Sequence, residues 1–205
     1  MTAGRPGLRL ARLYLASRRI PAALAVIAAC AVALRIALYW PWNTYGALQL
    51  PLILEAGCAA AIAITTACPF GESERATGRW LPFLRLGTVA ALTAAATGAL
   101  VAAATGMHLA GGALETVRNL VGLTGIGLLC GAVLGGALAW TGPMTYLIVG
   151  VYALYTQWHG PALTTPWIWP ARPGPDIGAA ICAGLVFAAG LAIITVRGAR
   201  DPVGG

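Results

Sequence analysis

The chain is poor in charge, and this scarcity narrows the classes of protein that it can belong to. Only 9% of its 205 residues are charged, whereas 59% are hydrophobic and the mean hydropathy is +0.80. An ordinary soluble domain is about 25% charged and roughly 45–50% apolar. The composition therefore excludes a soluble globular enzyme, a disordered tail and a nucleic-acid-binding module.

Lysine is missing altogether, so all thirteen basic residues are arginines. A standard P-loop needs a lysine that reaches the nucleotide phosphates, and this chain cannot form one. We therefore expect no enzymatic activity in this chain and no cofactor of its own. If ATP drives its function, ATP and Mg²⁺ bind to a separate subunit. The net charge of +7 is not a sign of nucleic-acid binding, because most of the arginines flank apolar runs, as membrane topology requires.

Six mostly apolar runs are long enough, or nearly so, to cross a lipid bilayer as helices of about 20 residues. They cover residues 20–40, 47–68, 84–107, 119–140, 143–159 and 177–196. The sequence Thr141-Gly142-Pro143 is expected to separate the fourth run from the fifth, because proline disfavours continuation of a helix. The sequence thus predicts an all-α membrane protein with one transmembrane domain over residues 20–205.

The arginines are distributed unevenly between the two ends of these runs. Cytoplasmic loops of membrane proteins are enriched in Lys and Arg. If the N-terminus is cytoplasmic, only Arg118 and Arg172 lie outside and Arg35 lies within the first span. The ten others are then cytoplasmic: Arg5, Arg9, Arg12, Arg18, Arg19, Arg75, Arg79, Arg85, Arg197 and Arg200. This bias predicts that both termini face the cytoplasm.

The N-terminal segment, residues 1–20, combines arginines on one side of a helical wheel with apolar residues on an adjacent side. This pattern predicts an amphipathic helix that lies on the cytoplasmic surface of the membrane. Such a helix either contacts a cytoplasmic partner or serves only as a topological anchor.

The predicted cytoplasmic loop at residues 69–85 (PFGESERATGRWLPFLR) carries charges of both signs. Topology alone requires only positive charge there, so the acidic residues are compatible with a docking surface, and the alternative is a solvated loop. A short helix at about residues 72–81 would present these side chains to the cytoplasm. The candidate docking residues are Glu72, Glu74, Arg75, Arg79 and Trp80.

Two charged residues, Arg35 and Glu55, fall inside predicted spans. An unpaired charge near the bilayer centre costs about 2.5–3.5 kcal/mol or more. Counting from the connecting loop near Asn43, their depths differ by roughly 5 Å at a rise of 1.5 Å per residue. We therefore expect an ion pair between them. The alternative is that Glu55 lines a translocation path and attracts a cationic cargo.

Small residues recur in the fourth run, where Gly127, Gly131 and Gly135 are spaced four apart. This spacing allows helices to approach closely, either within the chain or between two copies of it. The third run is rich in Ala and Thr and is expected to lie inside the bundle.

The outer loop at residues 159–176 contains five prolines, which exclude a regular helix. Trp167 and Trp169 in this loop predict a lid that dips into the membrane interface.

Together these features resemble those of the small ABC-2-type exporter permeases, in particular the short actinobacterial ones. The resemblance rests on the basic helix before the first span, the loop GESERATGRWLPFLR, the Arg118-Asn119-Leu120 entry into a Gly-rich span, and the elaborated outer segment before the last span. It implies that Glu72, Glu74, Arg75, Arg79 and Trp80 contact an ABC ATPase subunit. It also implies a second permease chain, identical or homologous, and a place in the bacterial inner membrane.

Two other functions stay open at this point. The chain could be an ion-coupled carrier or a substrate-capture subunit that uses Glu55 and Arg35, or a membrane assembly protein that transports nothing. For the exporter, we expect an amphipathic or hydrophobic substrate such as a peptide or a secondary metabolite, and no nucleic-acid partner.

Overall fold

The computed structural model describes residues 19–42, 44–67, 81–156 and 165–197. Throughout these ranges the regular secondary structure is helical. The long helices are α2 (Ile20–Ala37), α3 (Thr44–Ile64), α5 (Leu81–Ala103), α6 (Gly112–Leu134), α7 (Thr141–Thr156) and α8 (Ile177–Arg197). Two single 3₁₀ turns, η1 (Gly136–Leu138) and η3 (Trp169–Ala171), lie between them.

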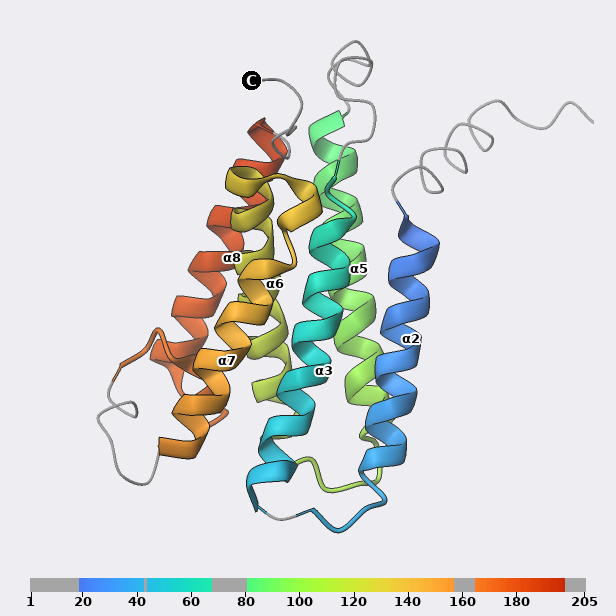
Figure 1. Cartoon of the computed structure of the whole chain (residues 1–205), viewed down its shortest axis with the longest axis vertical. Coiled ribbons are helices and arrows are strands. Elements are labelled where there is room, and N and C mark those ends of the chain that lie inside the picture. The colour runs from blue at the N-terminus through green and yellow to red at the C-terminus, as the bar shows by residue number, and fades with distance from the viewer. Residues whose placement is uncertain (1–18, 43, 68–80, 157–164, 198–205) are drawn as a thin grey trace, which may run out of the picture.

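Within this part of the chain, six helical segments are long and apolar enough to cross a membrane, as the sequence predicts. Consecutive helices run in opposite directions (Figure 1). We call the end where α2 begins and α8 ends the proximal end, and the opposite end the distal end. The connections 38–42 and 104–111 and the segment 165–176, here named the distal segment, lie at the distal end (Figure 1).

Helix α6 is the centre of the bundle. It packs most extensively against α8 and also contacts α3, α7 and α5. About 56% of its membrane-length window is buried, compared with 28% for α5. Helix α5, the Ala- and Thr-rich third run that was expected inside the bundle, is therefore less enclosed than α6. Glycine explains the difference, because residues without a side chain let α6 approach several neighbours at once.

Two of the long helices, α6 and α8, cross with their backbones in close approach. A Cβ atom added at Gly125 would lie 2.5 Å from the backbone nitrogen of Phe187, and one at Gly190 would lie 2.6 Å from the carbonyl oxygen of Gly125. Real Cβ atoms almost never approach other atoms so closely, so the two backbones could not keep this separation with larger residues. Small residues on both helices therefore set the α6–α8 distance.

Substituting Gly125 by alanine is expected to lower the free energy of unfolding by about 1–3 kcal/mol, because the backbone of α8 cannot yield as a flexible side chain does. Gly98 on α5 offers a matched control, since a Cβ there meets nothing within 4 Å. Gly98→Ala should leave stability unchanged or raise it by up to about 1 kcal/mol. Unfolding by SDS in mixed micelles, followed by circular dichroism, measures both. Equal stability of the two variants would contradict this account.

The other glycines of α6 have separate roles. Gly127 and Gly131 are buried within the chain, where they face Ala63 of α3 and Ala139 after η1. This part of the stripe is thus covered by the chain's own helices. Gly135 has a φ of 97°, a left-handed conformation that suits glycine, and it ends α6.

The break between α6 and α7 consequently differs from the prediction. It begins at Gly135 rather than at Thr141-Gly142-Pro143. Pro143 instead lies in the first turn of α7. Proline is tolerated there because the first N–H groups of a helix have no intrahelical acceptor. The fourth helix also begins seven residues earlier than predicted, at Gly112, so it includes Glu115 and Arg118.

Candidate functional site: a buried polar cluster

Polar side chains gather inside the distal half of the bundle, where α3 meets α6. Glu55 lies about three turns into α3 and is only 2% exposed. The side chains of Thr116 and Asn119 on α6 hydrogen-bond to its carboxyl group, and both are buried. Asn119 also hydrogen-bonds to the half-buried Glu115. We call Glu55, Glu115, Thr116, Arg118 and Asn119 the polar cluster.

The predicted ion pair between Arg35 and Glu55 is not formed. Arg35 lies in the last turn of α2, so it is near the distal end rather than at the depth of Glu55. Its guanidinium donates to the carbonyl oxygens of Ala103 (3.1 Å) and Thr105 (2.8 Å). A cation is favoured there because the last carbonyls of a helix, here α5, have no intrahelical partner and carry the negative end of the helix dipole.

Arg118 joins the polar cluster to the distal segment. It is 4% exposed, and its two terminal nitrogens donate to the carbonyl oxygens of Pro173 (2.7 Å) and Arg172 (2.9 Å). The carboxyl groups of Glu115, Asp176 and Glu55 lie within range of its positive charge. A buried arginine is stable only with such partners, so Arg118 holds the distal segment in place while it balances charge inside the bundle.

Asp176 fixes the end of the distal segment. Its Oδ1 accepts a hydrogen bond from the backbone N–H of Ala179 (2.8 Å), so it caps the first turn of α8. Its Oδ2 binds Arg172, at 2.8 Å from Nε and 2.5 Å from the terminal nitrogen. The Ala179 hydrogen bond, followed by the contacts with Arg172, lowers the pKa of Asp176 below its ordinary value. The carboxylate therefore stays ionised at neutral pH.

The two tryptophans of the predicted lid behave differently. Trp167 is 53% exposed, whereas Trp169 is 2% exposed and stacks on Tyr146 of α7, with ring centroids 4.5 Å apart. A Cβ added at Gly122 would meet the indole of Trp169, so that glycine leaves the space which the ring fills. The Tyr146 hydroxyl donates to the carbonyl oxygen of Trp167 (2.6 Å). The expectation that Trp169 dips into the interface is wrong, because the ring plugs the space between α6 and α7.

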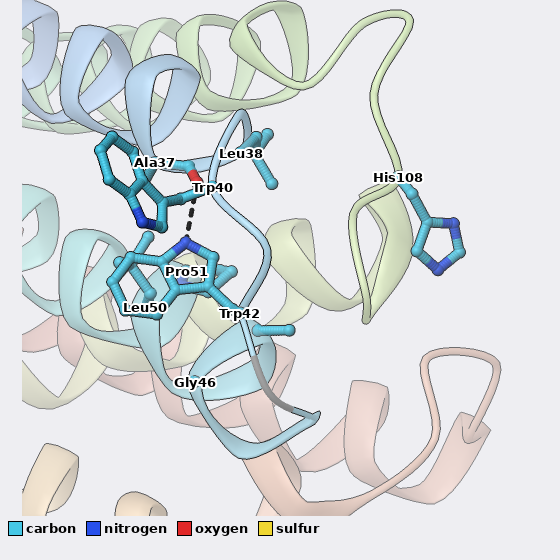
Figure 2. Close-up of a pocket in the computed structure, with 9 residues that line it drawn as sticks. Ala37, Leu38, Trp40, Trp42, Gly46, Leu50, Pro51 and His108 are labelled. Atoms are coloured by element: carbon cyan, nitrogen blue, oxygen red, sulfur yellow. Dashed lines mark hydrogen bonds between the residues drawn. The ribbon is translucent and has the colours of Figure 1, made fainter.

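A separate cavity of about 180 Å³ opens at the distal end, between α2, α3 and the 104–111 connection. In Figure 2 the indole of Trp42 is drawn at Pro51 and that of Trp40 beside Ala37, while the imidazole of His108 stands apart from both. The Trp42 Nε1 donates to the carbonyl oxygen of Ala37 (2.7 Å). Both side chains are exposed on the surface of the bundle, and tryptophans are typical of the membrane–water interface.

Several buried polar atoms of this region have no hydrogen-bond partner. They are Glu55 Oε2, Asn119 Oδ1, Arg118 Nε and Trp169 Nε1. Buried polar atoms are normally paired, and each unpaired one costs about 1–3 kcal/mol. Concentrated polar groups with spare bonding capacity inside a membrane bundle indicate a functional region rather than a purely structural core.

Sequence reasoning identified Glu55 but missed its partners. Arg118 and Asn119 entered the sequence analysis only as an outer charge and as part of the entry to the fourth span, and Glu115 was not considered. A signal did exist, because residues 115, 118 and 119 are three and four apart and therefore share one face of a helix. The docking residues Glu72, Glu74, Arg75, Arg79 and Trp80, and nearly all of the N-terminal segment, lie outside the described residues. The last part of the 69–85 loop, from Leu81 on, belongs to α5.

Comparison with known proteins finds no family model, no curated protein and no solved structure that matches this chain. The class therefore follows from the fold itself. The six helices of membrane-spanning length and composition define a multi-pass α-helical membrane protein.

Proposed function

We propose that the chain is the membrane permease subunit of an ATP-driven exporter of the ABC-2 type. In this proposal the ATPase is a separate subunit, and a second permease chain completes the path in the bacterial inner membrane. The substrate is an amphipathic or hydrophobic compound such as a peptide or a secondary metabolite. Substrate crosses as the helices alternate between two packings.

One observation carries the proposal. The end of α3 and the start of α5, which flank the segment carrying Glu72 and Arg75 in the sequence, lie at the proximal end, where α2 begins and α8 ends (Figure 1). A positively charged proximal end is the cytoplasmic end by the positive-inside rule, and an ATPase would bind there. This position of the flanking helix ends supports the proposal that the loop between them couples the permease to an ATPase.

The polar cluster supports a transport role. Its side chains lie on α3 and α6 and are tied through Arg118 to the distal segment. Because this network joins two spanning helices to the distal segment, a movement of the helices would be transmitted to that segment. In a transporter, such movement would open the distal end for release.

Reversing the two central charges of the loop, Glu72→Arg with Arg75→Glu, is expected to abolish association with the ATPase. Like charges placed opposite each other across an interface cost several kcal/mol, so the amount of co-purified ATPase should fall at least about tenfold. The measurement is vanadate-sensitive ATP hydrolysis that co-purifies with the tagged chain from native membranes in mild detergent.

Asp201→Arg provides the control, since it changes charge after the last span without touching the loop. This variant should retain the associated hydrolysis. The proposal fails if the wild-type chain never isolates with an ATPase, or if the loop reversal leaves hydrolysis at the wild-type level.

A further inference from the structure

We infer that Glu55, Thr116 and Asn119 form a binding site for one alkali-metal cation inside the bundle. The site goes beyond the proposed permease function and requires no ATPase, because all of its ligands come from α3 and α6 of this chain.

The ligand atoms are oxygens of side chains that are each at least 95% buried. Thr116 and Asn119 act on the Glu55 carboxyl through their side chains, so the three residues are neighbours across the contact of α3 and α6. Glu55 Oε2 and Asn119 Oδ1 have no partner. Carboxylate, amide and hydroxyl oxygens are the ligands that hard cations prefer.

Charge balance favours a single positive charge. Three carboxyl groups, those of Glu55, Glu115 and Asp176, lie within range of the Arg118 charge. The same region contains two guanidinium groups, those of Arg118 and Arg172. When all of these groups are ionised, three negative charges are set against two positive charges. Arg172 is paired with Asp176, and the terminal nitrogens of Arg118 bind neutral carbonyl oxygens, so one carboxylate of the polar cluster lacks a counter-charge. A monovalent cation at Glu55 restores neutrality, as uptake of a proton also would, whereas a divalent cation would overcompensate.

The neighbouring groups offer no competing cation at this point. The charged groups that act on Glu55 are Glu115 and Arg118, both from α6. Cys58, one turn further along α3, faces Cys30 of α2. The two unpartnered donors, Arg118 Nε and Trp169 Nε1, belong to side chains that hold the distal segment. The acceptors are therefore concentrated on the Glu55 side of the cluster.

The test measures thermal unfolding of the purified full chain in detergent at constant pH and ionic strength. The starting buffer contains the chloride salt of N-methyl-D-glucamine, whose cation is too large for a buried site. This salt is then replaced in steps by NaCl or by KCl. Because an ion that binds only the folded state stabilises it by mass action, the unfolding temperature should rise with the logarithm of the Na⁺ or K⁺ concentration. Comparing the two salts identifies which ion fits.

Glu55→Gln should abolish this rise, while Asp201→Asn, which removes a carboxyl outside the spans, should keep it. If Glu55→Gln does not fold, Thr116→Val keeps the shape without the hydroxyl and should raise the half-saturating ion concentration about tenfold. The inference is overturned if the wild-type chain unfolds at one temperature in all salts, if only pH changes that temperature, or if Thr116→Val responds as the wild type does. None of these results bears on ATPase association, which is measured separately.

Discussion

Replacing Arg118 by leucine is expected to lower the free energy of unfolding by about 3–5 kcal/mol, the usual cost of removing one partner from a buried ionic network. The substitution leaves the carbonyl oxygens of Arg172 and Pro173 without their donors. It also leaves Glu115 and Glu55 without the cation that faces them. SDS-driven unfolding in mixed micelles measures the loss.

Arg35→Leu is the matched control for this prediction. Arg35 also donates to two backbone carbonyl oxygens, but it is only half-buried and does not face Glu55. Its loss should therefore cost only about 1–2 kcal/mol. If the two substitutions cost the same, Arg118 acts only as a hydrogen-bond donor and its role in balancing buried charge is wrong.

Trp169→Ala is expected to cost about 3–5 kcal/mol, as large-to-small changes of buried aromatic residues do. The ring is 2% exposed and stacked on Tyr146, so its removal leaves a hole between α6, α7 and α8. Cys182 packs against the same small core and is half-buried. In a variant that keeps only this cysteine, its labelling by a water-soluble maleimide should become faster when Trp169 is removed.

Trp167→Ala tests whether this effect is specific to the buried ring. Trp167 is 53% exposed, and its link to Tyr146 runs through the backbone carbonyl, which the substitution retains. This control should change stability by no more than about 0.5 kcal/mol and leave Cys182 labelling unaltered. Equal effects of the two variants would show that the distal segment does not act as a plug.

The polar cluster illustrates how far sequence reasoning could reach. Glu55 was singled out because a carboxyl in an apolar run is costly wherever it lies. Its partner was mispredicted, since depth along a hairpin gives no information about which face of a helix a side chain occupies. Glu55 faces α6, so its partners come from a helix about 60 residues away in the sequence rather than from Arg35.

The glycines show the same division between sequence and structure. Their four-residue spacing predicted close packing in the fourth helix, and Gly127 and Gly131 do lie against α3 and η1. The backbones of α6 and α8, however, approach each other at Gly125 and Gly190, which belong to no shared repeat. Spacing indicates which residues share a face, but the crossing point of two helices depends on how both are placed.

The sequence by itself determined the class of this protein and the number of its long apolar helices, because the cost of leaving backbone polar groups in lipid permits few alternatives. Composition and helix length are local properties and can be counted. Only the tertiary structure decided that α6 is central, that Arg118 holds the distal segment, that Trp169 is buried and that Glu55 faces Asn119. These features depend on which faces of distant helices meet, and the packing of all six helices together sets that choice.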